Sequence, residues 1–182
     1  FSEKLRELGA EVMEIPTIKI VSLKSDKQLK DAFLSDAYKW IFFSSSNGVY
    51  EFAAFLKRVG KDSRIFGQAK ICAIGTETAK SLRSIGIIPD YIPKQFIAEE
   101  IVRHFNRDRH YFSRLKKIGK NSVCPYFKVS PCALILRAKK ARDILPEGLK
   151  AAGFKVKIID LYDTVLPKES SQALKQALKE HI

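Results

Sequence analysis

Several features are scarce in this sequence of 182 residues, and each scarcity excludes a class of protein. No stretch approaches 18 uninterrupted apolar residues, so no membrane-spanning helix is predicted. The first residues lack the basic start, apolar centre and small-residue cleavage site of a secretory signal, so we expect none. Neither a GxGxxG motif nor a Walker A lysine pattern occurs, and nucleotide binding therefore has little support.

Cysteine and histidine occur only three times each. Cys72, Cys124 and Cys132 form no CxxC pair, and the histidines are scattered along the chain. The sequence therefore predicts no metal site and no Ser-His-Asp or Cys-His arrangement. An odd cysteine count without a secretory signal favours a reducing compartment, and we expect a cytoplasmic protein. Cys72 lies between apolar neighbours and is interpreted as a small buried residue.

Acidic residues are also few: 20 Asp and Glu stand against 33 Lys and Arg, a net charge of +13. Most of this excess lies in residues 103–142, which hold twelve cations and one acid, Asp108. Residues 108–132 of this stretch form a basic insert with interspersed aromatics and no recognisable strand or helix unit. One hypothesis is therefore a nucleic-acid-binding or anion-binding α/β module that uses residues 103–142.

A short unit occurs three times, with its glycine at Gly9, Gly86 and Gly153. Each copy is typical of a helix that carries a basic residue near its C-terminus and ends at a left-handed glycine. A strand is predicted within about three residues of each glycine. This is the helix-to-strand connection of an α/β fold.

Apolar runs at Trp40–Phe43, Ile71–Ile74 and Ala133–Leu136 are typical of strands that are buried on both faces. Each run precedes a polar or glycine-containing turn and then a helical pattern. These helical patterns cover Val49–Val59, Thr76–Ile85 and Arg142–Ala152. The order predicts a doubly wound parallel sheet of the flavodoxin-like or Rossmann-like kind, with a mixed α+β domain as the alternative.

Ligands of such sheets bind beyond the carboxyl ends of the strands, where three turns are predicted to lie. In the first turn, Ser44 and Ser45 offer hydroxyl groups beside a helix start, which we expect Ser46 or Asn47 to cap. The second turn contains Gly75 and Thr78, and its alternative interpretation is a simple cap by Thr76. The third turn, residues 137–142, begins with Arg137 and carries four cations that could pair with ligand carboxylates or face solvent.

Four segments in this order resemble the uroporphyrinogen-III synthase family. They are WIFFSSSNGV at 40–49, AIGTETAKSLRSI at 73–85, PDYIPKQFIA at 89–98, and 134–164, which ends in the Y-x-T of Tyr162 and Thr164. The resemblance covers residues 1–107 and 132–182. It departs from the family where Ser44 replaces the commoner Thr, where Ala138 replaces a Gly, and at the insert.

The resemblance implies two doubly wound domains that are joined by two linker strands. Residues 24–160 would be one complete domain, and residues 1–15 and 168–182 would be fragments of the second. Residues 16–23 and 161–167 would be the interdomain linkers. The chain is therefore expected to be a truncated piece that is weakly active or inactive.

The resemblance also implies a cyclising hydro-lyase of heme and porphyrin biosynthesis. It would convert the linear tetrapyrrole hydroxymethylbilane to uroporphyrinogen III, with inversion of ring D and loss of water, and without a cofactor or metal. Tyr162 would donate a proton to the leaving hydroxyl, as a phenol that is protonated at neutral pH can do. Ser44, Ser45, Gly75 and Thr78 would hold the acetate and propionate arms, while the missing Gly after Arg137 weakens a similar role for that residue.

These interpretations imply a monomer with a small-molecule substrate and no membrane or metal partner. Fusion to, or association with, other enzymes of the tetrapyrrole pathway, such as a methyltransferase, is left open. A sensor of small anions would share the cleft architecture but would need a secretion signal.

Overall fold

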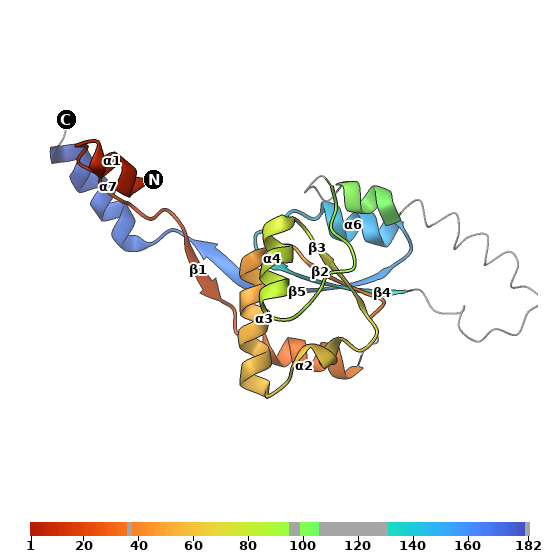
Figure 1. The fold of residues 1–182 in the computed structure, drawn as a ribbon. Coiled ribbons are helices and arrows are strands. Elements are labelled where there is room, and N and C mark those ends of the chain that lie inside the picture. The colour runs from red at the N-terminus through yellow and green to blue at the C-terminus, as the bar shows by residue number, and fades with distance from the viewer. Residues whose placement is uncertain (36–37, 95–98, 106–130, 181–182) are drawn as a thin grey trace, which may run out of the picture. The chain divides into compact units, whose positions relative to one another are not determined.

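The computed structural model describes residues 1–35, 38–94, 99–105 and 131–180. The chain divides into two compact units, one of Ser22–Asp163 and one of Phe1–Val21 with Thr164–Ile182. One five-stranded sheet runs in the order β1-β5-β4-β2-β3 (Figure 1). The strands are β1 (Lys19–Ser22), β2 (Trp40–Phe43), β3 (Lys70–Ala73), β4 (Cys132–Ala138) and β5 (Lys155–Val165).

Three of the strand pairings are parallel: β2 with β3, β2 with β4, and β4 with β5. The predicted strands at 40–43, 71–74 and 133–136 are confirmed to within two residues at each end. Parallel strands need long connections, and helices provide them here. The helices of the larger unit are α2 (Asp26–Ser35), α3 (Ser46–Val59), the short 3-10 helix η1 (Ser63–Phe66), α4 (Thr76–Ser84) and α6 (Ile144–Ala151), together with the helical residues 99–105.

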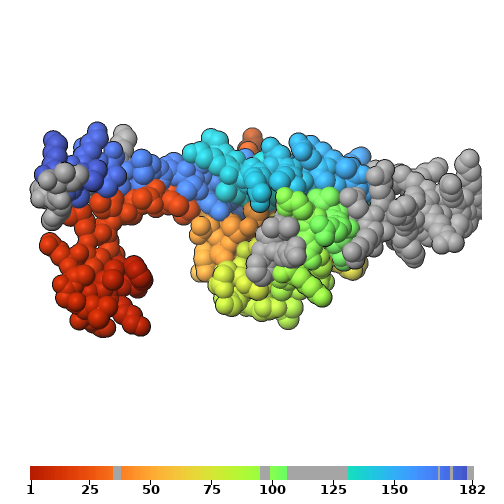
Figure 2. Space-filling model, turned by 90° about the horizontal axis from the view of Figure 1, so that it is seen from above, coloured from red at the N-terminus to blue at the C-terminus, as the bar shows by residue number. Residues whose placement is uncertain are grey.

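Both faces of the central strands are buried under helices, which explains the unbroken apolar runs. In β2 all four residues are buried, and alternate side chains join different clusters. Ile41 and Phe43 pack with residues of α2, α3 and α4, whereas Trp40 and Phe42 pack with α6 and residues 99–105. In Figure 2 the light blue residues of α6 lie beside the green residues 99–105. The chain is thus a mixed α/β protein with a mostly parallel sheet.

The three predicted helix-ending glycines adopt positive φ angles, of 83° at Gly9, 79° at Gly86 and 95° at Gly153, so this prediction is confirmed. The strands predicted after them are confirmed only once, where β5 begins at Lys155. After Gly86 a single bridge pairs Tyr91 with Cys72, and residues 10–18 contain no strand. A glycine signal marks where a helix ends, but a strand also needs a neighbour with which to pair.

The helix predicted over Arg142–Ala152 begins later, at Ile144. Arg137 lies inside β4, which extends to Ala138, and the other cations of residues 137–142 lie between this strand and the helix. Most of the insert at 108–132 falls outside the described residues. Cys72 is fully buried as predicted, and burial raises the pKa of its thiol.

The smaller unit contains α1 (Ser2–Glu7) and α7 (Lys168–Glu180). On α7, Leu174 and Leu178 are each about half exposed, at 49% and 53%, whereas Ser170 is buried. Across the described residues of both units, no helix has the length and apolar character needed to cross a membrane. Within the same residues, no three His, Cys, Asp or Glu side chains gather as a metal-binding group.

Candidate functional site

The predicted site residues of the larger unit gather at the carboxyl edge of the parallel strands. Ser44 and Ser45 follow β2, Gly75 follows β3 after one residue, and Arg137 lies near the end of β4. Tyr162 of β5 pairs with Ala138, the last residue of β4. Since the three strand pairings are parallel, these positions come to one edge of the sheet (Figure 1).

Ser44 is tied to the neighbouring strand through two hydrogen bonds. Its backbone N–H and its hydroxyl group both donate to the carbonyl oxygen of Leu136, at 3.2 and 3.3 Å. Its side chain therefore supports the junction between the ends of β2 and β4. A Ser-to-Ala change would remove only one of these two bonds.

Ser45, rather than Ser46 or Asn47, is the N-cap of α3, so the predicted cap was wrong by one residue or more. Its backbone is extended, with φ −161° and ψ 158°, and its hydroxyl oxygen accepts a hydrogen bond from the N–H of Gly48 at 3.1 Å. Gly48 is buried, and a Cβ added there would lie 3.4 Å from Ser45 Oγ. The hydrogen bond from the first turn of α3 thus holds this hydroxyl in place.

The same Ser45 hydroxyl is hydrogen-bonded to the phenol of Tyr162, with Oγ and OH 2.8 Å apart. Tyr162 is only 6% exposed, and its backbone carbonyl accepts from the N–H of Lys139 at 2.9 Å. The two hydroxyl-bearing residues are 117 positions apart in the chain. The fold therefore joins the predicted proton donor to a predicted hydroxyl of the substrate site.

An irregularity in the sheet explains why Tyr162 reaches Ser45. The register passes from Arg137 opposite Asp160 to Ala138 opposite Tyr162, so that Leu161 is skipped. Neighbouring strand residues normally face opposite sides, yet Leu161 and Tyr162 pack in the same core cluster, the one that also contains residues of α3. The bulge therefore directs the tyrosine toward the N-terminus of α3.

Gly75 and Thr78 lie at the start of α4, although neither caps it through a side chain. Gly75 is the N-cap with φ 104° and ψ 155°, a conformation that favours glycine, and Thr76 is the first helical residue. The alternative of a cap by Thr76 is therefore wrong. Thr78 is 3% exposed, and its hydroxyl donates to the carbonyl of Ile74 at 3.1 Å.

Arg137 is held between two carboxylates. Its Nη1 donates to Asp143 at 2.8 Å and its Nε to Asp160 at 3.2 Å, and the side chain is only 11% exposed. Burial alone would lower the pKa of the guanidinium, but the two carboxylates outweigh it and raise that pKa. Its predicted contact with substrate would use other N–H groups of the guanidinium, since the two aspartates accept from only two of its five donors.

Two carboxylates of this arrangement, Asp143 and Asp160, were missed in the sequence. Asp160 is on β5, and its partners are distant in sequence. Its carboxylate accepts from Arg137, and its backbone carbonyl accepts from the hydroxyl of Ser25 at 2.6 Å. Nearby, Lys139 and Lys140 each approach Asp163, at 3.9 and 4.0 Å, and both lysine side chains are well exposed. The sequence shows only that acids lie near a cationic turn, and this does not indicate which acid pairs with which cation.

Comparison with known proteins gives one family. The model of the family described as uroporphyrinogen-III synthase HemD matches residues 1–182. The chain belongs to the uroporphyrinogen-III synthase HemD family. The predicted family resemblance is thereby confirmed, and no comparison supports the nucleic-acid alternative, whose basic stretch lies largely outside the described residues.

Curated relatives agree with this membership of the uroporphyrinogen-III synthase family. A porphyrin biosynthesis protein HemD of Ruminiclostridium josui is 30% identical over 97% of this chain and 32% of its own length. A uroporphyrinogen-III synthase of Synechococcus elongatus is 32% identical over 68% of this chain and 48% of its own length. The chain thus spans about a third to a half of the curated relatives that it matches.

A solved structure shows the same fold. The uroporphyrinogen III synthase of Thermus thermophilus, in a mutant form, superimposes with a TM-score of 0.67 over 98% of this chain and 63% of that chain. The two sequences are 16% identical, so this likeness concerns the fold alone. The mixed α/β architecture with its largely parallel sheet is therefore that of the family.

Proposed function

We propose that this chain forms part of a uroporphyrinogen-III synthase, a cyclising hydro-lyase of porphyrin and heme biosynthesis. Its substrate is hydroxymethylbilane, which loses water, inverts ring D and closes to uroporphyrinogen III. The observation that carries the proposal is the family match over all 182 residues. The hydroxyl-rich carboxyl edge, where Ser45 and Tyr162 meet, supports it because the reaction needs an acid for the leaving hydroxyl.

The finer architecture is part of the same proposal. Residues 24–160 form one doubly wound domain, and residues 1–15 and 168–182 are fragments of a second domain. Residues 16–23 and 161–167 link the two. The division of the chain at 21–22 and 163–164, and the helices on both faces of the sheet, favour this assignment. The substrate binds at the carboxyl edge of the complete domain.

In this mechanism Tyr162 gives its proton to the leaving hydroxyl, and Ser45 is a positioning residue. Ser45 Oγ accepts the N–H of Gly48 and keeps its own proton to donate to the phenol oxygen. The phenol proton is then free to point at the substrate. As the phenolate forms, the Ser45 hydroxyl and the positive end of the α3 dipole stabilise its charge.

The remaining residues orient the flexible, polycarboxylate substrate, since unguided ring closure is easy and the enzyme must select the geometry of attack. Backbone amides at the starts of α3 and α4 receive carboxylate oxygens, and Gly75 allows the backbone to approach them closely. The hydroxyls of Ser44 and Thr78 hold these loops through their bonds to backbone carbonyls. Arg137 contributes positive potential while its two aspartate partners orient it. No cofactor or metal takes part.

The experiment is an isomer assay. The chain is incubated with hydroxymethylbilane, and the type I and type III products are separated after oxidation, with buffer and heat-denatured protein as blanks. We expect an excess of type III over both blanks, small because the chain spans less than half the length of the curated relatives that it matches. Replacing Tyr162 with Phe should reduce the rate of type III formation by about 10²-fold or more, as expected for loss of a general acid.

The matched control is Tyr50→Phe, which removes the hydroxyl of a tyrosine on α3 that is 55% exposed and accepts from Ser81. Its rate should equal that of the unaltered chain. Formation of the type I isomer alone at every protein concentration would contradict an activity of this chain by itself. A Tyr162→Phe rate equal to that of Tyr50→Phe would remove Tyr162 from the mechanism.

A further inference from the structure

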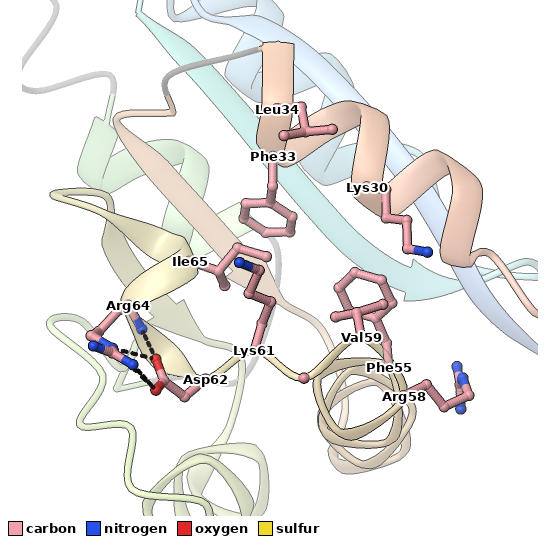
Figure 3. A pocket seen from close by; sticks show the side chains of 11 residues that line it. Lys30, Phe33, Leu34, Phe55, Arg58, Val59, Lys61, Asp62, Arg64 and Ile65 are labelled. Carbon is pink, nitrogen blue, oxygen red and sulfur yellow. Dashed lines mark hydrogen bonds and ion pairs between the residues drawn. The ribbon is translucent and has the colours of Figure 1, made fainter.

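A cavity of about 920 Å³ lies in the larger unit, away from the site described above. Its walls come from α2, from the second half of α3 and from the segment that leads through η1 toward β3 (Figure 3). Helix α3 carries the chain from the end of β2 back to the start of the parallel β3. The cavity therefore lies at the amino edge of the strands, whereas Tyr162 and Ser45 lie at the carboxyl edge.

Apolar side chains form the floor and walls of this cavity. Phe33 on α2 faces the gap, and Val59 and Ile65 extend the apolar surface, whereas Phe55 on α3 lies beneath it and is fully buried (Figure 3). Phe33, Val59 and Ile65 are only partly buried, and Leu34 at the rim is 86% exposed. Such walls suit an apolar body such as an aromatic ring, and the volume is within the range of small-molecule sites.

The rim of the cavity is cationic. The charged residues that line it, among those the structure describes, are Lys30, Arg58, Lys61, Arg64 and a single acid, Asp62. Both arginines are already paired: Arg58 binds Asp26 through two hydrogen bonds of 2.6 and 2.8 Å, and Arg64 binds Asp62. These pairs orient the arginines, and the two lysines take no part in them.

Lys30 and Lys61 form no salt bridge within the part of the chain that the structure describes. Each contributes to lowering the pKa of a carboxylate that an arginine already holds, Asp26 for Lys30 and Asp62 for Lys61. In Figure 3 their side chains extend along the gap that Phe33 borders. The lining itself therefore brings four cations and one acid to an apolar cleft.

We propose that this cavity is a second binding site, for a small amphipathic carboxylate. The apolar part of the ligand packs on Phe33, Val59 and Ile65, and its carboxylate lies at the cationic rim, where Lys30 and Lys61 are. The site is independent of the proposed synthase activity, since it shares no residue with the carboxyl edge.

The probe is 2-naphthoate, with neutral 2-naphthamide as its isosteric control, and binding to the whole chain is followed by calorimetry and by NMR shifts. We expect 2-naphthoate to bind, 2-naphthamide to bind about fivefold more weakly, and the shifts to centre on Val59 and Ile65. The double variant Lys30→Gln/Lys61→Gln should bind 2-naphthoate more weakly by a similar factor and should bind 2-naphthamide as the unaltered chain does. Leu34→Glu should also weaken it, since it adds a carboxylate at the rim.

The matched control is Lys57→Gln, an exposed lysine on α3 that does not line the cavity, and it should bind 2-naphthoate like the unaltered chain. All of the substituted positions are exposed, and circular dichroism checks that each variant folds. Equal binding of 2-naphthoate to the unaltered chain and the double variant would overturn the proposal. Shifts that centre outside the cavity, or no binding by the folded chain, would overturn it as well.

Discussion

The two edges of the parallel sheet hold charged and polar side chains in different ways. At the carboxyl edge, Ser44, Ser45 and Thr78 bond to backbone groups of strand ends and helix starts, and Arg137 is only 11% exposed between two acids. At the amino edge, Arg58 pairs with its acid in a more exposed position. Backbone-anchored groups have few alternative positions, so the carboxyl edge is suited to orienting a reaction, and the amino edge to adjustable binding.

Among the tests of this difference between the edges, the substitution of Ser45 should have the largest effect. Ser45→Ala removes both the cap of α3 and the hydrogen bond to Tyr162. We expect kcat for type III formation to fall roughly tenfold with little change in KM, and stability to fall by about 1 kcal/mol. Steady-state kinetics and denaturant unfolding measure the two effects.

Ser45→Thr is the matched control, because it keeps a hydroxyl at the same position and should restore most of kcat and of stability. A purely structural role for Ser45 would lower stability and leave kcat per folded molecule unchanged. That outcome would separate Ser45 from Tyr162 and reduce it to a helix cap.

Much of the fold could be predicted from the sequence because its signals are local. The apolar run Trp40–Phe43 predicts a doubly buried strand whatever its neighbours are, and Gly153 predicts a helix end followed closely by a strand. The four segments at 40–49, 73–85, 89–98 and 134–164 together also sufficed to suggest the family. Local signals of this kind depend only on residues within a turn or two.

The contacts of the site could not be predicted in the same way, because they depend on register. Tyr162 meets Ser45 only because Leu161 is skipped in the pairing of β4 with β5, and no sequence pattern marks that bulge. Arg137 pairs with Asp160 through register too, since the two are directly opposite in the sheet. The cap of α3 was misplaced because three consecutive serines offer the same hydroxyl.

Two arginine substitutions test this comparison, because each removes an arginine–aspartate pair, one at the carboxyl edge and one at the amino edge. Arg137→Met leaves Asp160 partly buried without its cation, and we expect a loss of about 2 kcal/mol of unfolding free energy. Arg58→Met breaks a pair whose side chains are 46% and 31% exposed, and we expect a loss of about 0.5 kcal/mol of unfolding free energy. Urea denaturation at neutral pH of both variants and the unaltered chain gives the two values.

Salt provides the control for this pair, because it screens exposed charges more than covered ones. Raising the salt concentration to about 1 M should nearly abolish the effect of Arg58→Met and preserve most of the effect of Arg137→Met. Equal losses for the two variants, or equal sensitivity to salt, would show that the two edges do not differ in this respect.

The smallest expected effect concerns Asp62, on the amino edge. Hydrogen bonds from the side chain and backbone N–H of Arg64 lower the pKa of Asp62 from 3.8 to about 2. Because the folded value lies below the unfolded one, the stabilisation is fully present above about pH 4 and disappears as the pH falls through about 2. Thermal unfolding of Asp62→Asn should therefore show a slightly lower melting temperature than the unaltered chain at about pH 6 and nearly the same one near pH 2. If the difference in melting temperature were as large near pH 2 as at about pH 6, Asp62 would act mainly by capping η1, where its side chain accepts from the N–H of Arg64. The charge of Asp62 would then contribute little to stability.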